Sequence, residues 1–92
     1  MRKWQNPYLI VRADGVVLYD SANSAEIFLK TEEVLPALAG LSASKWPYGR
    51  VVAVAAATKA SEQEAVAIRR NKGIVGGMLD RAHIVVRWVT TG

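Results

Sequence analysis

The chain has 92 residues, of which 51% are hydrophobic and 22% are charged, and it contains no cysteine. These values are typical of one globular domain, and they exclude a disulfide framework, a thiolate nucleophile and a cysteine-ligated zinc site. The longest apolar run, residues 51–57, is too short to span a bilayer, and residues 1–8 lack the apolar stretch of a signal peptide. We therefore expect a single cytoplasmic domain over residues 1–92, with residues 1–6 as an N-terminal extension.

The first predicted element is a β-hairpin. Residues 8–13 (YLIVRA) and 16–20 (VVLYD) are rich in strand-forming residues. They flank Asp14-Gly15, a pair that readily supplies the two positive φ values of a type I′ turn. Apolar side chains alternate onto both faces of the first strand, which predicts a central strand or a sheet face that meets a partner.

Two short helices are predicted to follow the hairpin. Residues 22–29 begin with poor strand formers, and their apolar residues recur at helical spacing, which predicts a first short helix. A second short helix is expected from Thr31 to Gly40, because two glutamates follow the capping Thr31 and a glycine commonly ends a helix.

Residues 50–60 (RVVAVAAATKA) allow two interpretations. Their valines favour a buried strand, whereas their alanines and the polar residues near the end favour a helix. We favour the helix for this segment.

The stretch from Ser61 to residue 82 also allows two interpretations. Ser61 and Glu64 could form the capping box of one long helix, but three glycines would then destabilise it by roughly 1 kcal/mol each relative to alanine. Strands over residues 64–70 and 74–79 accommodate those glycines better, and we favour them. In either case residues 83–90 alternate as a last strand.

The resulting order of elements resembles that of the PAS domain family. The similarity is strongest over Asn6 to Leu29 (NPYLIVRADGVVLYDSANSAEIFL), although the family often has Asn and Pro where this chain has Ser21 and Ala22. The resemblance implies a five-stranded antiparallel sheet with helices on one face, a small-molecule cavity between them, and dimerisation through the other face. The alternative fold is a ββαβαβ two-layer sandwich.

A PAS-like sensory, signalling or dimerisation module is therefore the leading functional hypothesis, with a homodimer or another signalling domain as partner. The missing cysteine argues against flavin-cysteinyl photochemistry, and the position of the only histidine, His83, argues against haem, which leaves an organic ligand or none. Arg12 and Arg87 are candidate contacts for an anionic ligand, and a salt bridge at the rim is the alternative role for each. Candidate pocket residues, chosen as apolar or small groups on inward-facing elements, are Val11, Leu18, Ser21, Ile27, Phe28, Val51, Val54 and Trp88.

Two other functions are considered. The net charge of +4 and the cluster of Arg69, Arg70 and Lys72 are compatible with a basic α/β domain that binds nucleic acid through these three residues. Residues 47–52 (PYGRVV) resemble a short stretch in the soluble domain of the biopolymer-transport (ExbD/TolR) family, but the membrane anchor of that family is not seen in the sequence.

No group of residues predicts catalysis or a metal site. One histidine without cysteine leaves no usual nucleophile and base pair. Asp80 and His83 are three residues apart, but two ligands without a third make a poor metal site. We expect a protein that is not an enzyme.

Overall fold

The structure is a computed structural model that describes residues 6–20, 25–41, 44, 46–47, 49–57 and 61–89. The described elements include a 3-10 helix, η1, which leads directly into the first α-helix. In chain order they are β1 (Tyr8–Arg12), β2 (Gly15–Asp20), β3 (Ala25–Leu29), η1 (Thr31–Glu33), α1 (Val34–Ala39), β4 (Val51–Ala56), α2 (Glu62–Arg81) and β5 (Val85–Trp88). None of the described helices is both long and apolar enough to cross a membrane.

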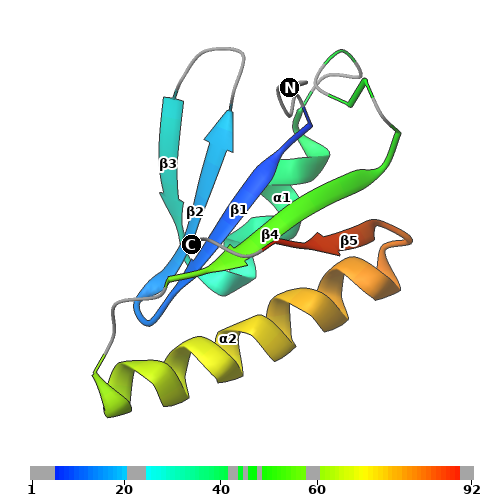
Figure 1. Ribbon diagram of the computed structural model, residues 1–92. Coiled ribbons are helices and arrows are strands. Elements are labelled where there is room, and N and C mark those ends of the chain that lie inside the picture. Colours follow the sequence, from blue (N-terminus) through cyan, green and yellow to red (C-terminus); the bar gives the residue numbers. More distant parts are fainter. Residues whose placement is uncertain are drawn as a thin grey trace.

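The five strands form one mixed sheet in the order β3-β2-β1-β4-β5 (Figure 1). The β1–β2 and β2–β3 pairs are antiparallel, whereas β4 runs parallel to both β1 and β5. The predicted α/β class is confirmed, but the predicted antiparallel sheet is wrong. The parallel pairing of β4 and β5 arises from α2, which carries the chain back from the end of β4 so that β5 starts beside the start of β4.

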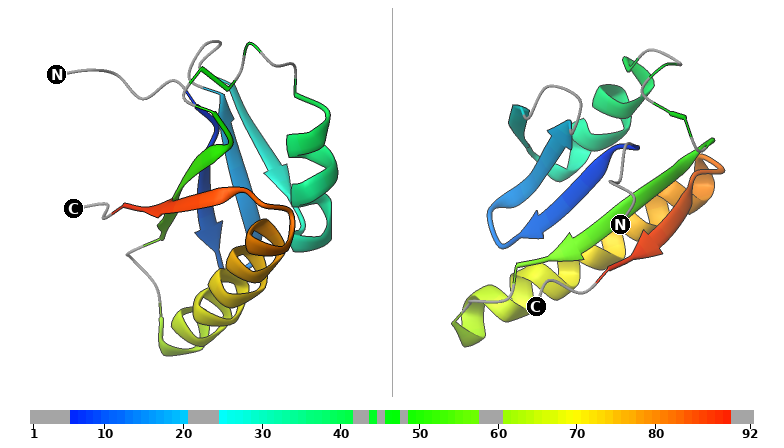
Figure 2. Two further views of the ribbon diagram at one scale, coloured as in Figure 1. Left: turned by 90° about the vertical axis from the view of Figure 1, so that its right-hand side faces the viewer. Right: turned by 45° about the horizontal axis from the view of Figure 1, so that its top comes forward.

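Both α-helices lie on one face of the sheet (Figure 2). Apolar side chains from the sheet and from both helices fill the layer between them. This core contains Leu9, Val11, Val16, Leu18, Leu29, Val34, Leu38, Trp46, Val52, Val54, Ile68, Val75 and Leu79. The opposite face of the sheet is covered by no described helix, and we call it the open face.

β4 shows that the predicted helix over residues 50–60 is wrong. It is flanked by β1 and β5, and its residues Val52 to Ala55 are all buried. A strand buried on both faces is continuously apolar and lacks the alternation that marks a half-exposed strand. The alanines that favoured a helix therefore fit a central strand.

α2 replaces the two strands predicted over residues 64–70 and 74–79. The capping box at its start is present: the Ser61 N–H donates to Glu64 Oε1 at 3.1 Å, and the Glu64 N–H donates to Ser61 Oγ at 3.2 Å. Ile68, Val75 and Leu79 recur at helical spacing and are buried against the sheet. This burial outweighs the helix-destabilising glycines.

The segment before the first helix is also a strand. β3 pairs with β2 along its whole length, so the predicted helix over 22–29 is wrong for residues 25–29, whereas residues 22–24 lie outside the described part. In β3, Ile27, Phe28 and Leu29 have high strand propensity, and all three pair with residues of β2. The helix predicted between Thr31 and Gly40 is confirmed as η1 followed by α1.

The predicted hairpin is confirmed, but its turn differs. Ala13 and Asp14 are the central turn residues, and neither has a positive φ, so the turn is not type I′. Gly15 instead opens β2 with a φ of +154°, and a Cβ there would lie 2.5 Å from the Leu29 carbonyl oxygen. The glycine is required by the close approach of β3. The last predicted strand is confirmed as β5.

Candidate nucleic-acid interface

Strand register arranges the side chains of the open face in rows that cross the sheet. One row passes over all five strands and consists, from β3 to β5, of Glu26, Tyr19, Tyr8, Ala53 and Arg87. The row beside it crosses four strands and consists of Phe28, Val17, Ile10 and Ala55. Since side chains alternate along a strand, these rows share the face opposite to the buried Leu9 and Val11.

Three aromatic rings gather on the half of the open face formed by β1, β2 and β3. Tyr8 and Tyr19 are directly opposite each other in the antiparallel pair, where Cβ atoms lie about 5 Å apart. Phe28 is diagonal to Tyr19 on the neighbouring strand and is 50% exposed. We call Tyr8, Tyr19 and Phe28 the aromatic patch. Tyr8 and Tyr19 are half-buried, and neighbouring rings that are partly exposed offer flat apolar surfaces on which other rings can stack.

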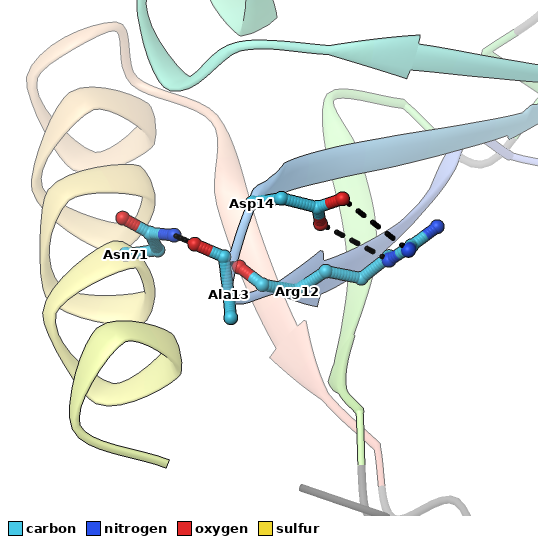
Figure 3. Close-up of polar contacts among 4 residues, drawn as sticks. All are labelled: Arg12, Ala13, Asp14 and Asn71. Carbon is cyan, nitrogen blue, oxygen red and sulfur yellow. Dashed lines mark hydrogen bonds and ion pairs between the residues drawn. The ribbon is translucent and has the colours of Figure 1, made fainter. Parts of the chain in front are cut away.

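Two guanidinium groups flank the aromatic patch. The Arg12 guanidinium carbon lies 6.0 Å from the centre of the Phe28 ring, and Arg87 is exposed at the β5 end of the long row. Arg12 is also held by Asp14, with Nε 3.2 Å from one carboxylate oxygen and Nη2 3.3 Å from the other (Figure 3). Glu26 places one carboxylate at the far end of the row from Arg87. The open face therefore combines rings with two guanidinium groups, of which that of Arg12 is ion-paired with Asp14, and with the carboxylate of Glu26.

The structure does not bring the predicted pocket residues together. Val11, Leu18 and Val54 pack inside the core, whereas Ile27, Phe28 and Trp88 are about half exposed. Phe28 and Val51 lie on the open face, but Ile27 and Trp88 are on the helix side of the two outer strands. Ser21 lies outside the described residues. These side chains do not line one common space.

The three predicted nucleic-acid contacts are on α2, on the helix side of the sheet. Arg69 and Arg70 are exposed, and Lys72 is half-buried with its ammonium 5.2 Å from the centre of the Trp88 ring. They are thus separated by the sheet from Arg12 and Arg87, the two predicted anion contacts, which share the open face. Among the described residues, no three side chains of metal-ligating type gather at one place.

Asn71 is a structural residue that sequence analysis did not identify. Its side chain is 6% exposed, and its amide nitrogen donates to the carbonyl oxygens of Arg12 at 2.8 Å and Ala13 at 3.3 Å (Figure 3). The helix thereby fixes the turn that carries Arg12. A buried amide in the middle of an otherwise apolar helix face is the signal that points to such a residue.

Asn6 plays the corresponding part at the other end of β1. It is fully buried, and its amide nitrogen donates to the carbonyl oxygens of Gly49 at 2.9 Å and Val51 at 2.7 Å. These bonds connect the entry of β1 to the entry of β4 and so support the strand pair that carries Tyr8. Both ends of the central strand are held by buried amides.

Comparison of the chain with protein-family models, curated proteins and solved structures finds no match.

Proposed function

We propose that this protein is a non-enzymatic domain that binds single-stranded nucleic acid on the open face of its sheet. The observation that carries the proposal is the aromatic patch with Arg12 and Arg87 beside it, on a sheet face that the helices leave uncovered. Unpaired bases stack on exposed rings, and cationic side chains contact the backbone between them. The net charge of +4 favours a polyanion over a basic or neutral ligand.

The dimensions of the open face also favour a short single strand. Five strands at their usual spacing place the outer two about 19 Å apart, and five residues along a strand span about 17 Å. Such an area is well below the roughly 800 Å² that each partner contributes to a stable protein interface. It is sufficient for the two or three bases that other open sheets bind by stacking.

The test is fluorescence anisotropy of a labelled oligothymidylate titrated with the full chain at several salt concentrations. Phe28→Ala is expected to weaken binding roughly tenfold, because one stacked base is lost. Two phosphate contacts predict a slope of about −1.4 for log K against log salt, and Arg87→Gln is expected to reduce its magnitude by about 0.7.

Two control variants carry changes on the helix side. Val66→Ala alters an apolar side chain that is 66% exposed on α2, and the Arg69→Gln/Arg70→Gln pair removes two charges there. Both are expected to leave affinity unchanged within about twofold. If the arginine pair weakens binding while Phe28→Ala does not, the nucleic acid binds the helix and the proposed face is wrong. An absence of binding at low salt would refute the function itself.

A second candidate function keeps the resemblance to the PAS family, in which the open face pairs two copies of a signalling module. The observation in its favour is the second row, in which Ile10 is partly exposed and lies between the buried, apolar Val17 and Ala55. A dimer that is abolished by Ile10→Lys, without any affinity for nucleic acid, would support this candidate over the first.

A further inference from the structure

A groove runs along the outer side of β5, between this strand and the C-terminal half of α2. Its volume is about 680 Å³. Apolar groups form most of its wall, with one carboxylate and the only histidine at one end. The lining residues are Gly76, Asp80, His83, Ile84, Val85, Val86 and Trp88.

The backbone at this groove is an unpaired strand edge. β5 is the last strand of the sheet, and it bonds to β4 through alternate residues: the Val85 N–H donates to the Arg50 carbonyl at 2.8 Å, and the Val89 N–H donates to the Val54 carbonyl at 3.0 Å. Val86 and Trp88 therefore direct their N–H and C=O groups away from β4 and towards the groove. Such an edge is a template for another strand.

The side chains at this edge are more apolar than is usual for an exposed strand. Val85 is 61% exposed and Trp88 is 51% exposed. The Trp88 ring packs towards α2, where a Cβ on Gly76 would lie 3.4 Å from it. β5 has no proline or lysine, and Arg87 is the one charged residue among its four.

We infer that the occupant of this groove is a second copy of the chain, whose β5 pairs antiparallel with the first across a two-fold axis at Val86. This register places Trp88 opposite the partner copy's position 84, an isoleucine, and Arg87 opposite its position 85, a valine. A shift that centres the axis on Arg87 would set two arginines opposite each other, which is unfavourable. The axis at Val86 instead gives an aromatic–aliphatic pair on each side.

Charge complementarity supports the same two-fold arrangement. α2 runs back along β5, so Lys72 lies at the Trp88 end of the groove and Asp80 lines its other wall towards Ile84. The two-fold axis exchanges the ends of the strand, which brings the lysine of each copy towards the aspartate of the other. Within the described part of the chain neither side chain has a partner for an ion pair. Two equivalent ion pairs would therefore form across the interface.

Edge pairing continues the sheet from one copy into the next. Antiparallel neighbours in a sheet are related by an axis perpendicular to it, so both helix layers lie on one side and both open faces on the other. The dimer thus presents one open face of twice the width. This inference does not depend on what that face binds.

The experiment is sedimentation equilibrium of the full chain and of charge-reversed variants. Lys72→Glu and Asp80→Lys, each alone, are expected to weaken dimerisation roughly fivefold or more. Each substitution occurs in both copies of the dimer and therefore makes both exposed ion pairs repulsive. The double variant restores the pairs with opposite polarity and should return to the dissociation constant of the native chain. Arg70→Glu, a charge reversal on another side of α2, is the matched control and should behave as the native chain.

A second measurement uses the unaltered protein. Amide hydrogen exchange at Val86 and Trp88 is expected to slow as protein concentration rises, while exchange at the opposite edge, in β3, should not change. A chain that stays monomeric at millimolar concentration overturns the inference. A dimer that is indifferent to both single reversals overturns the proposed edge and places the contact elsewhere. Neither result bears on oligothymidylate binding, which is measured separately.

Discussion

Replacement of Asn71 by alanine tests whether α2 positions the turn that carries Arg12. The Asn71 amide makes two hydrogen bonds, at 2.8 Å and 3.3 Å, to carbonyl oxygens of the β1–β2 turn, and it is 6% exposed. The loss of a buried donor leaves its acceptors unsatisfied, which costs about 1–3 kcal/mol. Alanine recovers part of this through its higher helix propensity, about 0.6 kcal/mol.

We therefore expect Asn71→Ala to lower the free energy of unfolding by about 2 kcal/mol. For a domain of this size that corresponds to a fall in Tm of roughly 8–16 °C. Urea and thermal unfolding, followed by circular dichroism at 222 nm, measure both quantities. Asn71→Asp should be more destabilising at neutral pH, because a carboxylate cannot donate to either carbonyl and would face both of them.

Arg70→Ala is the matched control, since it alters the preceding, exposed residue of the same helix. Its free energy of unfolding should stay within about 0.5 kcal/mol of the native value. If Asn71→Ala falls within the same range, the two hydrogen bonds do not hold the turn, and the link between α2 and Arg12 is refuted.

Two glycine replacements are expected to change the free energy of unfolding in opposite directions. Gly73→Ala should raise the free energy of unfolding by about 1 kcal/mol, because a Cβ there meets nothing within 4 Å and alanine favours the helix; a fall in stability would show that the site is more crowded. Gly15→Ala should lower it by about 2 kcal/mol or more, because the new Cβ would lie 2.5 Å from the Leu29 carbonyl oxygen. Urea unfolding measures both, and an unchanged Gly15→Ala midpoint would contradict the close approach of β3.

Local sequence patterns were sufficient for the hairpin and for the helix predicted between Thr31 and Gly40. The hairpin has strand-forming residues on both sides of a turn, and η1 with α1 lies between acidic residues and a stopping glycine. β4 could not be identified in this way, because its neighbours come from residues 8–12 and 85–88, far away in the sequence. Only that pairing explains why an alanine-rich run is extended.

Only part of the candidate interface could be predicted, because the rest depends on strand register. Arg12 and Arg87 were named from the sequence as candidate anion contacts, and the strand register places both on the open face. The aromatic patch was not expected, since Tyr8 meets Tyr19 only through the register of the hairpin and Phe28 joins them only once β3 is a strand. Register is set by the turn, and the turn itself differs from the predicted type.

The glycines of α2 show how tertiary contacts can reverse a local preference. Gly76 lies against the Trp88 ring, so the absence of a side chain lets the helix approach β5 at that point. Gly73, one turn earlier, meets nothing and only weakens the helix. A sequence argument assigns both the same cost, whereas in the fold one of them allows the contact that shapes the groove. The burial of Ile68, Val75 and Leu79 against the sheet stabilises the helix. This stabilisation compensates for the low helix propensity of Gly76, whose missing side chain leaves room for the Trp88 ring.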